Sequence, residues 1–311
     1  MKRITLFIFL LLCCLACHNI SSNKKDKTLL RYDLPTVPMT VTSQQEANAY
    51  MVRHYWDKFP FADTMCVHQE AFLQPLFKQY VNILTSVSLP QAKEGVRRFM
   101  ELANKEKIVL TQCAALCQTY FHDPNSPYIN EEIYIEVLDV LLASPLLDAA
   151  DKAQPASLLA IAQRNRVGHK ALDLDFVAVE KNFPYTDDPD NVRTLYSLKA
   201  PYVLLFFNNP GCPNCKEVME QVLASEKITS LVAKKRLVVL SLYPDAQLED
   251  WQNYLPNLPR EWINAYNPNC YVKDNDIYDL KAIPTLYLLD KDKIVLVKDG
   301  TTAAQIEQAL P

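Results

Sequence analysis

Two cysteines three positions apart, Cys212 and Cys215, offer the most specific chemistry in this sequence. Thiol–disulfide exchange needs a thiolate that attacks a disulfide sulfur and a second thiol that resolves the mixed disulfide. Because Pro213 suits the first position of a helix, Cys212 is expected at a helix N-terminus, where free backbone N–H groups favour a thiolate. Cys215 would lie one turn further in. The spacing therefore predicts Cys212 as the nucleophile and Cys215 as the resolving thiol.

The same spacing also occurs in zinc half-sites and in static disulfides. Tetrahedral zinc would need a second pair of cysteines or a Cys/His pair, and none follows in the sequence. We therefore expect no metal site. Because the Cys212–Cys215 pair would itself carry the electrons, no diffusible cofactor is expected. A peroxidase is disfavoured, since the sequence offers a paired motif and not a single peroxidatic cysteine.

The elements around the motif alternate between strand and helix patterns. Apolar runs predict strands, and helical periods predict helices. In chain order these are strands 174–179 and 202–207, helix 213–224, strand 237–242, helix 247–254, strands 285–289 and 294–298, and helix 301–310. The second strand would deliver the chain to Cys212 at the start of the first helix. This order predicts an α/β domain over residues 167–311.

This part of the chain resembles a TlpA-like member of the thioredoxin superfamily. The resemblance rests on the two cysteines, the segments 167–174 and 195–199, and Pro284 immediately before an apolar strand. In that family the proline is cis and faces the cysteines, and the residue before it pairs its backbone with the substrate chain. The resemblance therefore implies a cis Pro284, and it implies substrate binding by Ile283 and Pro284.

Three positions depart from the family pattern. Gly211 stands before the first cysteine, where an aromatic residue is common, and Phe206 stands where thioredoxins have a buried aspartate. Glu217 lies one position before the helix glutamate of related reductases. Glu217 is thus a candidate proton relay, and a solvated carboxylate in the first helical turn is the alternative. The direction of electron flow stays open on these residues.

Residues 44–166 have a helical period and predict an all-helical domain of five or six helices. Asn130, followed by two glutamates, is the expected N-cap of one helix. An aromatic cluster at 55–64 is expected to serve the core and its turns, with a docking site as the alternative. The domain resembles the helical domain of unknown function that precedes thioredoxin domains in Bacteroidota lipoproteins, and this resemblance implies no activity.

Four cysteines outside the motif have open roles. Cys113 and Cys117 lie four apart on one helix, and we expect them in the core because free cysteine is among the most buried residue types. A disulfide between Cys66 and one of them is the alternative. Cys270 is expected to be an inert, partly buried thiol, with a third redox thiol as its alternative.

Residues 1–17 have the pattern of a lipoprotein export signal. Lys2 and Arg3 precede an apolar run that is too short to span a bilayer. Ala16 before Cys17 resembles a lipobox, which predicts lipid modification of Cys17. An ordinary cleaved signal is the alternative.

Residues 18–43 are polar and are expected to form a flexible linker between the anchor and the first domain. The protein would then be exported and anchored to a membrane, facing the periplasm or the cell surface. Such compartments oxidise thiols more readily than the cytosol does, which suits a thiol–disulfide function.

The overall composition excludes two classes of function. The formal net charge is −4, so nucleic-acid binding has no electrostatic support. The chain has four glycines, and no glycine-rich phosphate loop is present in the sequence. Nucleotide-dependent enzymes are therefore disfavoured.

Together these features predict a membrane-tethered thiol:disulfide oxidoreductase that reduces protein disulfides. Its electrons would come from a membrane or periplasmic donor that the sequence does not name. The alternative is a non-catalytic binding lipoprotein, in which the thioredoxin-like domain is a scaffold and Cys212 and Cys215 form a structural disulfide.

Overall fold

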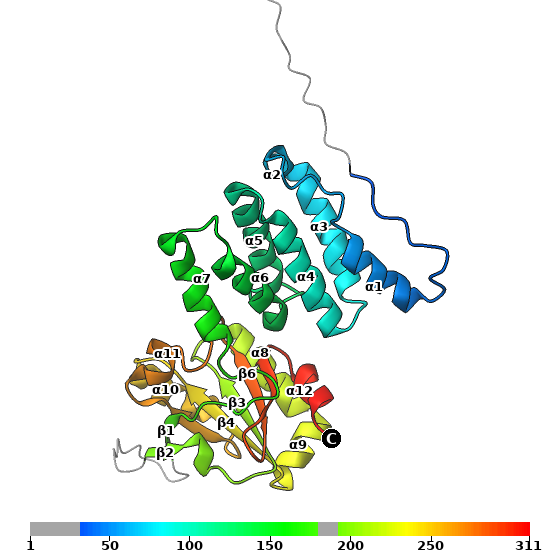
Figure 1. Ribbon diagram of the computed structural model, residues 1–311. Helices are drawn as coiled ribbons and strands as arrows, with labels where there is room; N and C mark the ends of the chain where they lie inside the picture. Colours follow the sequence, from blue (N-terminus) through cyan, green and yellow to red (C-terminus); the bar gives the residue numbers. More distant parts are fainter. Residues whose placement is uncertain (1–31, 180–191) are drawn as a thin grey trace, which may run out of the picture.

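The computed structural model describes residues 32–179 and 192–311 and arranges them in two domains (Figure 1). The helices of the first domain are α1 (Gln44–His54), α2 (Met65–His68), α3 (Glu70–Leu84), α4 (Leu89–Ala103), α5 (Lys107–Phe121), α6 (Glu131–Ala143) and α7 (Ala149–Ala162). The all-helical prediction is confirmed. The described part of this domain has seven helices where five or six were expected, because the four-residue α2 is too short to show a period in the sequence.

The aromatic cluster at 55–64 belongs to the core of the helical domain. Trp56 is 2% exposed, and its ring lies 4.8 Å from that of Phe99 on α4. The rings of Phe59 and Phe61 are also buried and lie 4.7 Å apart. Burial of such large side chains contributes much of a small domain's stability, which agrees with the expected core role.

Local sequence sets the beginning of several helices. The Asn130 side chain accepts a hydrogen bond of 3.1 Å from the Ile133 backbone N–H, as expected for an N-cap of α6. Ser43 caps α1 in the same way through the Glu46 N–H. These caps satisfy backbone donors that have no partner inside the helix.

The second domain is built on a mixed β-sheet. Its elements are β1 (Asp175–Ala178), β2 (Val192–Thr194), η2 (Leu195–Ser197), β3 (Tyr202–Phe207), α8 (Pro213–Ala224), α9 (Glu226–Ala233), β4 (Leu237–Tyr243), α10 (Leu248–Tyr254), η3 (Leu255–Asn257), β5 (Ile263–Tyr266), η4 (Pro268–Cys270), α11 (Tyr271–Asp274), β6 (Thr285–Asp290), β7 (Val295–Gly300) and α12 (Ala303–Ala309). The strand order is β2-β1-β5-β4-β3-β6-β7. Strand β3 is parallel to β4 and antiparallel to β6.

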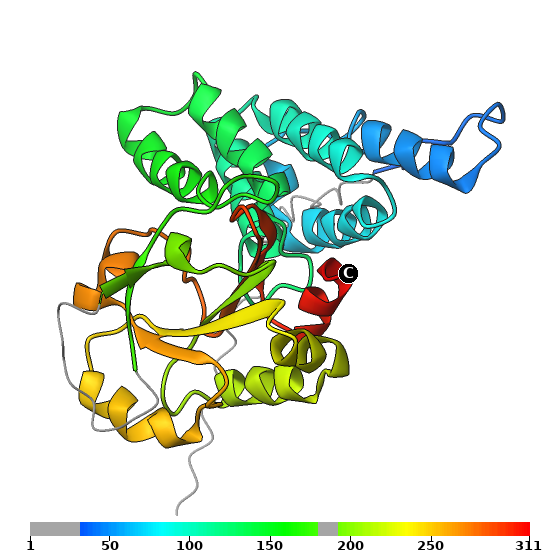
Figure 2. The same cartoon turned by 90° about the horizontal axis from the view of Figure 1, so that it is seen from below.

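Both faces of this sheet are buried. Leu204 and Phe206 of β3 face α8, α9 and α12, whereas Leu205 and Phe207 face the opposite side, where α11 and the chain before β1 lie. Figure 2 shows α8 and α12 together on one side of the sheet. Double burial explains why β3 is an unbroken apolar run, and it leaves the carboxyl end of β3 free to start α8.

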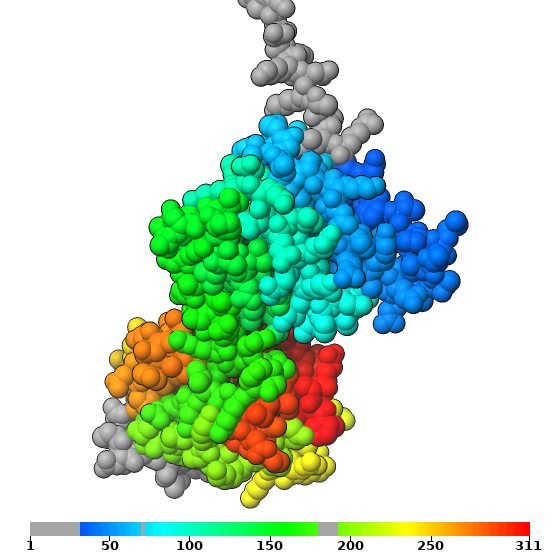
Figure 3. Space-filling model, viewed as in Figure 1, coloured from blue at the N-terminus to red at the C-terminus, as the bar shows by residue number. Residues whose placement is uncertain are grey.

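The two domains are in contact, as Figure 3 shows. Helix α7 ends at Ala162, and the chain passes from there into the sheet domain. Beside this crossing, Arg166 forms an ion pair with Glu132 of α6. The predicted signal segment 1–17 with Cys17, and most of the predicted linker 18–43, lie outside the described residues. Among those described, no helix is both long and apolar enough to cross a bilayer.

Candidate active site

The turn between β3 and α8 places Cys212 at the N-cap of α8. Pro213 occupies the first turn, and the backbone N–H of Cys215 donates a hydrogen bond of 3.2 Å to Cys212 Sγ. Such a bond, at the positive end of a helix, stabilises negative charge on the sulfur. The expected position of Cys212 at the start of a helix is therefore confirmed, and the residue is half-buried.

Gly211 forms part of the turn before Cys212. Its φ of +71° lies in the left-handed region that glycine adopts without strain, and a Cβ there would meet nothing within 4 Å. Backbone conformation, and not lack of space, thus explains why a glycine stands before Cys212 in place of the aromatic residue of the family pattern.

Cys215 lies behind Cys212 and is 4% exposed. Burial raises the pKa of the Cys215 thiol to about 12, and its hydrogen bond with Cys212 adds to the rise. Cys215 is therefore a protonated thiol at neutral pH. No disulfide links the six cysteines that the structure describes.

The loop before β6 faces these cysteines. The Ile283–Pro284 peptide bond is cis, as expected, and the carbonyl oxygen of Ile283 lies 3.6 Å from Cys212 Sγ. Pro284 is buried, and Thr285 Oγ1 donates to the Ala282 carbonyl at 2.5 Å. Cys212 thus lies beside Ile283 and Pro284, which are about seventy residues away in the sequence.

Two residues that depart from the family pattern, Phe206 and Glu217, lie in different surroundings. Phe206 is 1% exposed and packs its ring against Trp262, so this position supplies no carboxylate to Cys215. Glu217 is exposed on α8, where its carboxylate accepts a hydrogen bond of 3.4 Å from Gln221. Its role as a proton relay stays a prediction.

Tyr254, at the end of α10, is a neighbour of the site that sequence reasoning missed. Burial raises the pKa of Tyr254, and the charges of the Cys215 and Cys212 thiolates raise it further, so the phenol lies within electrostatic range of the pair. No local signal marks this tyrosine, because it lies about forty residues after the motif in a polar helix.

A polar group at the ends of two adjacent strands was also missed. Asn209 follows β3 and donates a hydrogen bond of 2.6 Å to Asp245, which follows β4 and is paired with Lys273. The carboxyl ends of parallel strands meet at one edge of a sheet, so the order of β3 and β4 could have predicted this contact. The bond ties the turn before Cys212 to the neighbouring strand.

The remaining cysteines differ sharply from this pair. Cys66, Cys113 and Cys117 are all fully buried in the helical domain. Burial raises the pKa of Cys66 to about 11 and raises that of the other two thiols as well. The expected place of Cys113 and Cys117 in the core is confirmed, and the alternative disulfide to Cys66 is not formed. Cys270 is half-buried with φ +52°, and burial and Asp274 raise the pKa of its thiol.

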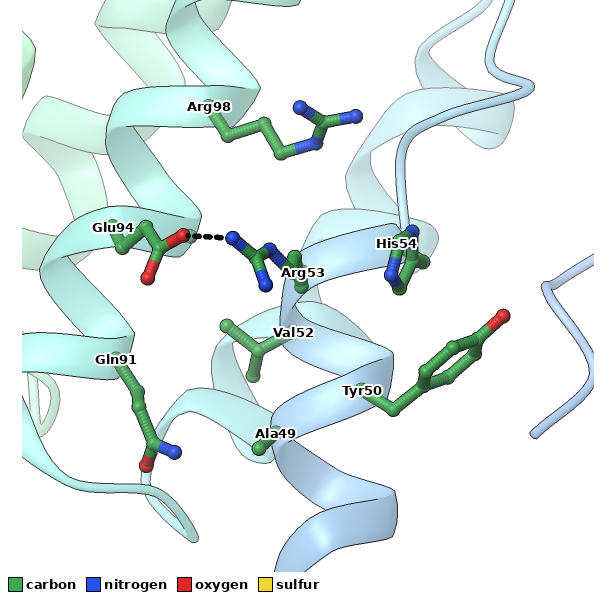
Figure 4. A pocket seen from close by; sticks show the side chains of 9 residues that line it. Ala49, Tyr50, Val52, Arg53, His54, Gln91, Glu94 and Arg98 are labelled. Atoms are coloured by element: carbon green, nitrogen blue, oxygen red, sulfur yellow. Dashed lines mark ion pairs between the residues drawn. The ribbon is translucent and has the colours of Figure 1, made fainter. Parts of the chain in front are cut away.

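A surface pocket of about 220 Å³ lies between α1 and α4, and no cysteine lines it (Figure 4). The charged groups on it already have partners, since Arg53 pairs with Glu94, and Arg98 and His54 both pair with Asp57. No unpaired charge in this pocket points to a ligand.

The sheet order, the cysteine pair at the start of α8 and the cis-proline facing it define a thioredoxin-like domain behind a helical one. Residues 201–295 match the family described as thioredoxin-like, and residues 15–165 match a domain of unknown function, DUF5106. A thioredoxin-like protein from Bacteroides caccae is 40% identical, with 90% of this chain and 98% of that chain covered and a TM-score of 0.83. The chain therefore belongs to this thioredoxin-like family.

Two further solved structures each cover about half of this chain. The C-terminal domain of an uncharacterized protein from Bacteroides fragilis is 43% identical over 47% of this chain and 97% of that chain, with a TM-score of 0.42. The thioredoxin domain of a thiol-disulfide oxidoreductase from Bacteroides vulgatus is 19% identical over 46% and 94%, with a TM-score of 0.38. No curated protein matches the chain.

Proposed function

We propose that this protein is an extracytoplasmic thiol:disulfide oxidoreductase that reduces disulfides in other proteins. One observation carries the proposal: Cys212 Sγ receives the Cys215 N–H and lies 3.6 Å from the carbonyl oxygen of Ile283, beside the cis-proline. This arrangement combines a nucleophile, a resolving thiol and a half-buried loop residue, Ile283, whose backbone would pair with a substrate chain.

The reaction would proceed in two exchanges. The Cys212 thiolate attacks one sulfur of the substrate disulfide, so that a Cys212–substrate bond forms and the other substrate sulfur leaves and takes up a proton. The Cys215 thiol then loses its proton and attacks Cys212 Sγ, which forms the Cys212–Cys215 disulfide and releases the first substrate sulfur. Two electrons pass from the protein dithiol to the substrate.

The second exchange requires a proton acceptor for Cys215, because its pKa of about 12 keeps it protonated. Phe206 replaces the buried aspartate of thioredoxins, so the acceptor is either solvent or Glu217, the candidate relay on α8. No diffusible cofactor takes part in these steps.

A new cycle requires the Cys212–Cys215 disulfide to be reduced by an external dithiol. We propose a membrane or periplasmic electron donor for this step, since lipid modification of Cys17 would hold the protein at a membrane that faces the periplasm or the cell surface. The anchor keeps the active domain near such a donor.

Replacement of Cys215 tests the proposal. In Cys215→Ala the first exchange proceeds but the second does not, so mixed disulfides between Cys212 and substrate proteins accumulate. They are detected as bands on non-reducing gels that disappear with dithiothreitol, and Cys212→Ser/Cys215→Ala is the matched control. A wild-type protein that fails to reduce insulin, together with a Cys215→Ala protein that traps nothing, overturns the proposal.

A redox titration separates the proposal from a scaffold with a structural disulfide. Structural disulfides of secreted proteins have reduction potentials below roughly −300 mV, whereas catalytic pairs are more easily reduced. We expect the Cys212–Cys215 pair to titrate above that value.

A further inference from the structure

The segment 275–284, named here the cis-proline segment, runs from the end of α11 to Pro284 and lies against the helical domain. Arg164 donates hydrogen bonds of 2.6 Å to the carbonyl oxygens of Asn275 and Asp276. Asn165, which is 4% exposed, donates one of 2.7 Å to the carbonyl oxygen of Ile277. Residues that follow α7 therefore hold the first part of the cis-proline segment.

An ion cluster holds the middle of the same segment. Lys281 Nζ lies 2.7 Å from Glu131 Oε1 and 2.6 Å from Asp279 Oδ2. Glu131, in the first turn of α6, also pairs with Lys298 of β7 at 2.5 Å. The exposed fractions of these side chains are between 7% and 16%, so the pairs are largely shielded from water.

Three carboxylates of this cluster lie close enough together to resemble a metal site. Oxygen atoms of Glu131, Asp279 and Asp299 are within 4.8 Å of one another. The ammonium groups of Lys281 and Lys298 already supply positive charge among them, so a metal ion would have to displace a lysine. The cluster is therefore better explained as a contact between domains.

Glu131 is the member of this cluster that the helical domain contributes. The other four groups, two lysines and two aspartates, all belong to the thioredoxin-like domain and balance one another in charge. Removal of the Glu131 charge would cut the ion pairs between the domains and would leave this balance in place. A neutral glutamine at 131 is thus a specific way to detach α6 from the cis-proline segment.

We propose that Glu131 and Lys281 are positioning residues, which fix the cis-proline segment for substrate binding beside Cys212. The inference rests on the proposed function and adds to it a role for the helical domain. Lys281 is two residues before Ile283, whose carbonyl oxygen lies 3.6 Å from Cys212 Sγ. A shift of Lys281 is therefore transmitted through two residues to the position where a substrate chain would bind.

The physical consequence depends on the size of the substrate. A protein disulfide must align its chain with Ile283 while its sulfur approaches Cys212, and small errors in such alignment slow a reaction strongly. A small disulfide needs only access to the sulfur of Cys212. The positioning role should thus appear as a preference for protein disulfides over small ones.

The test compares Glu131→Gln with Glu136→Gln. Glu136 lies on the same helix, is 7% exposed, and pairs with Lys93 and Arg97 inside the helical domain. For each reduced protein, the single-turnover rates with insulin and with hydroxyethyl disulfide are measured, together with thermal unfolding. We expect Glu131→Gln to lower the insulin rate about tenfold and to change the small-disulfide rate less than about twofold. Glu136→Gln should keep the wild-type ratio of the two rates.

Each outcome has a definite meaning. A wild-type ratio in folded Glu131→Gln, or an equal change of ratio in Glu136→Gln, overturns the positioning role. A wild-type protein that reduces neither substrate overturns the proposed function instead. If Glu131→Gln does not fold, Glu131→Asp replaces it, because it keeps the charge and shortens the reach to Lys281. A wild-type ratio in that variant also overturns the proposal.

Discussion

The two domains hold cysteines in opposite environments. In the helical domain Cys113 and Cys117 are fully buried, and burial raises the pKa of each thiol. In the thioredoxin-like domain Cys212 is at the N-cap of α8, receives a hydrogen bond from a backbone N–H and is half-buried. The residue type is the same in both places.

This contrast shows that reactivity depends on the local environment of a cysteine. A thiolate in an apolar core has lost its hydration and gains no compensating hydrogen bond, so the neutral thiol persists. At a helix N-terminus, free N–H groups replace the lost water. We therefore expect a serine substitution in the thioredoxin-like domain to lower the activity, and one in the helical domain to lower the stability.

Cys212→Ser should have the largest effect, and the effect should be on activity. A serine hydroxyl cannot take part in disulfide exchange, so the rate of insulin reduction should fall at least about a thousandfold. The melting temperature should stay close to that of the wild type, because residue 212 is half-exposed. Turbidity and thermal unfolding measure the two quantities. If this variant kept its activity, another cysteine would have to be the nucleophile.

Cys117→Ser should have a smaller effect, and the effect should be on stability. The Cys117 sulfur contacts the sulfur of Met100 in the core, and a hydroxyl there would lose its hydration. We expect the free energy of unfolding to fall by about 2 kcal/mol, measured by urea denaturation. Insulin reduction by the folded variant should equal that of the wild type. A loss of activity without a loss of stability would contradict the purely structural role of this cysteine.

Asp299→Asn, at the boundary between the domains, should have the smallest effect. Burial, and next the nearby Glu131, raise the pKa of Asp299 to about 6, above its ordinary value of 3.8. The native state therefore binds a proton more readily than the unfolded state, and the contribution of Asp299 to stability falls as the pH rises through about 6. Asparagine can still accept the hydrogen bond from Tyr287 and tolerates the φ of +54° at this position.

The pH dependence of this variant gives the measurement. Urea unfolding should show Asp299→Asn more stable than the wild type by about 1 kcal/mol at about pH 8, with little difference at about pH 4. The difference should grow between these two values. A variant that is equally destabilised at both would contradict the raised pKa of Asp299, because ionisation of its carboxylate would then not lower the stability between these pH values.

Long apolar runs and clear helical periods allowed much of the fold to be predicted. The predicted helix 213–224 has the bounds of α8, and the strand 202–207 has those of β3. Strand β5 was not predicted, because its four residues include an asparagine and form no apolar run. It exists because it pairs with β4 and β1, contacts that lie outside any local window.

The sequence by itself determined the local chemistry of the site. Cys212, Pro213 and Cys215 are so close in the sequence that helix geometry alone brings them together. The cis bond at Pro284 was implied by the family resemblance of the sequence, and the structure has it. Only the tertiary structure decided which distant groups surround them. Tyr254, whose pKa the cysteines affect, and Glu131, which pairs with Lys281, belong to elements far from the motif in the sequence. Their positions depend on how the helices pack against one another and against the sheet, and no short stretch of sequence encodes that packing.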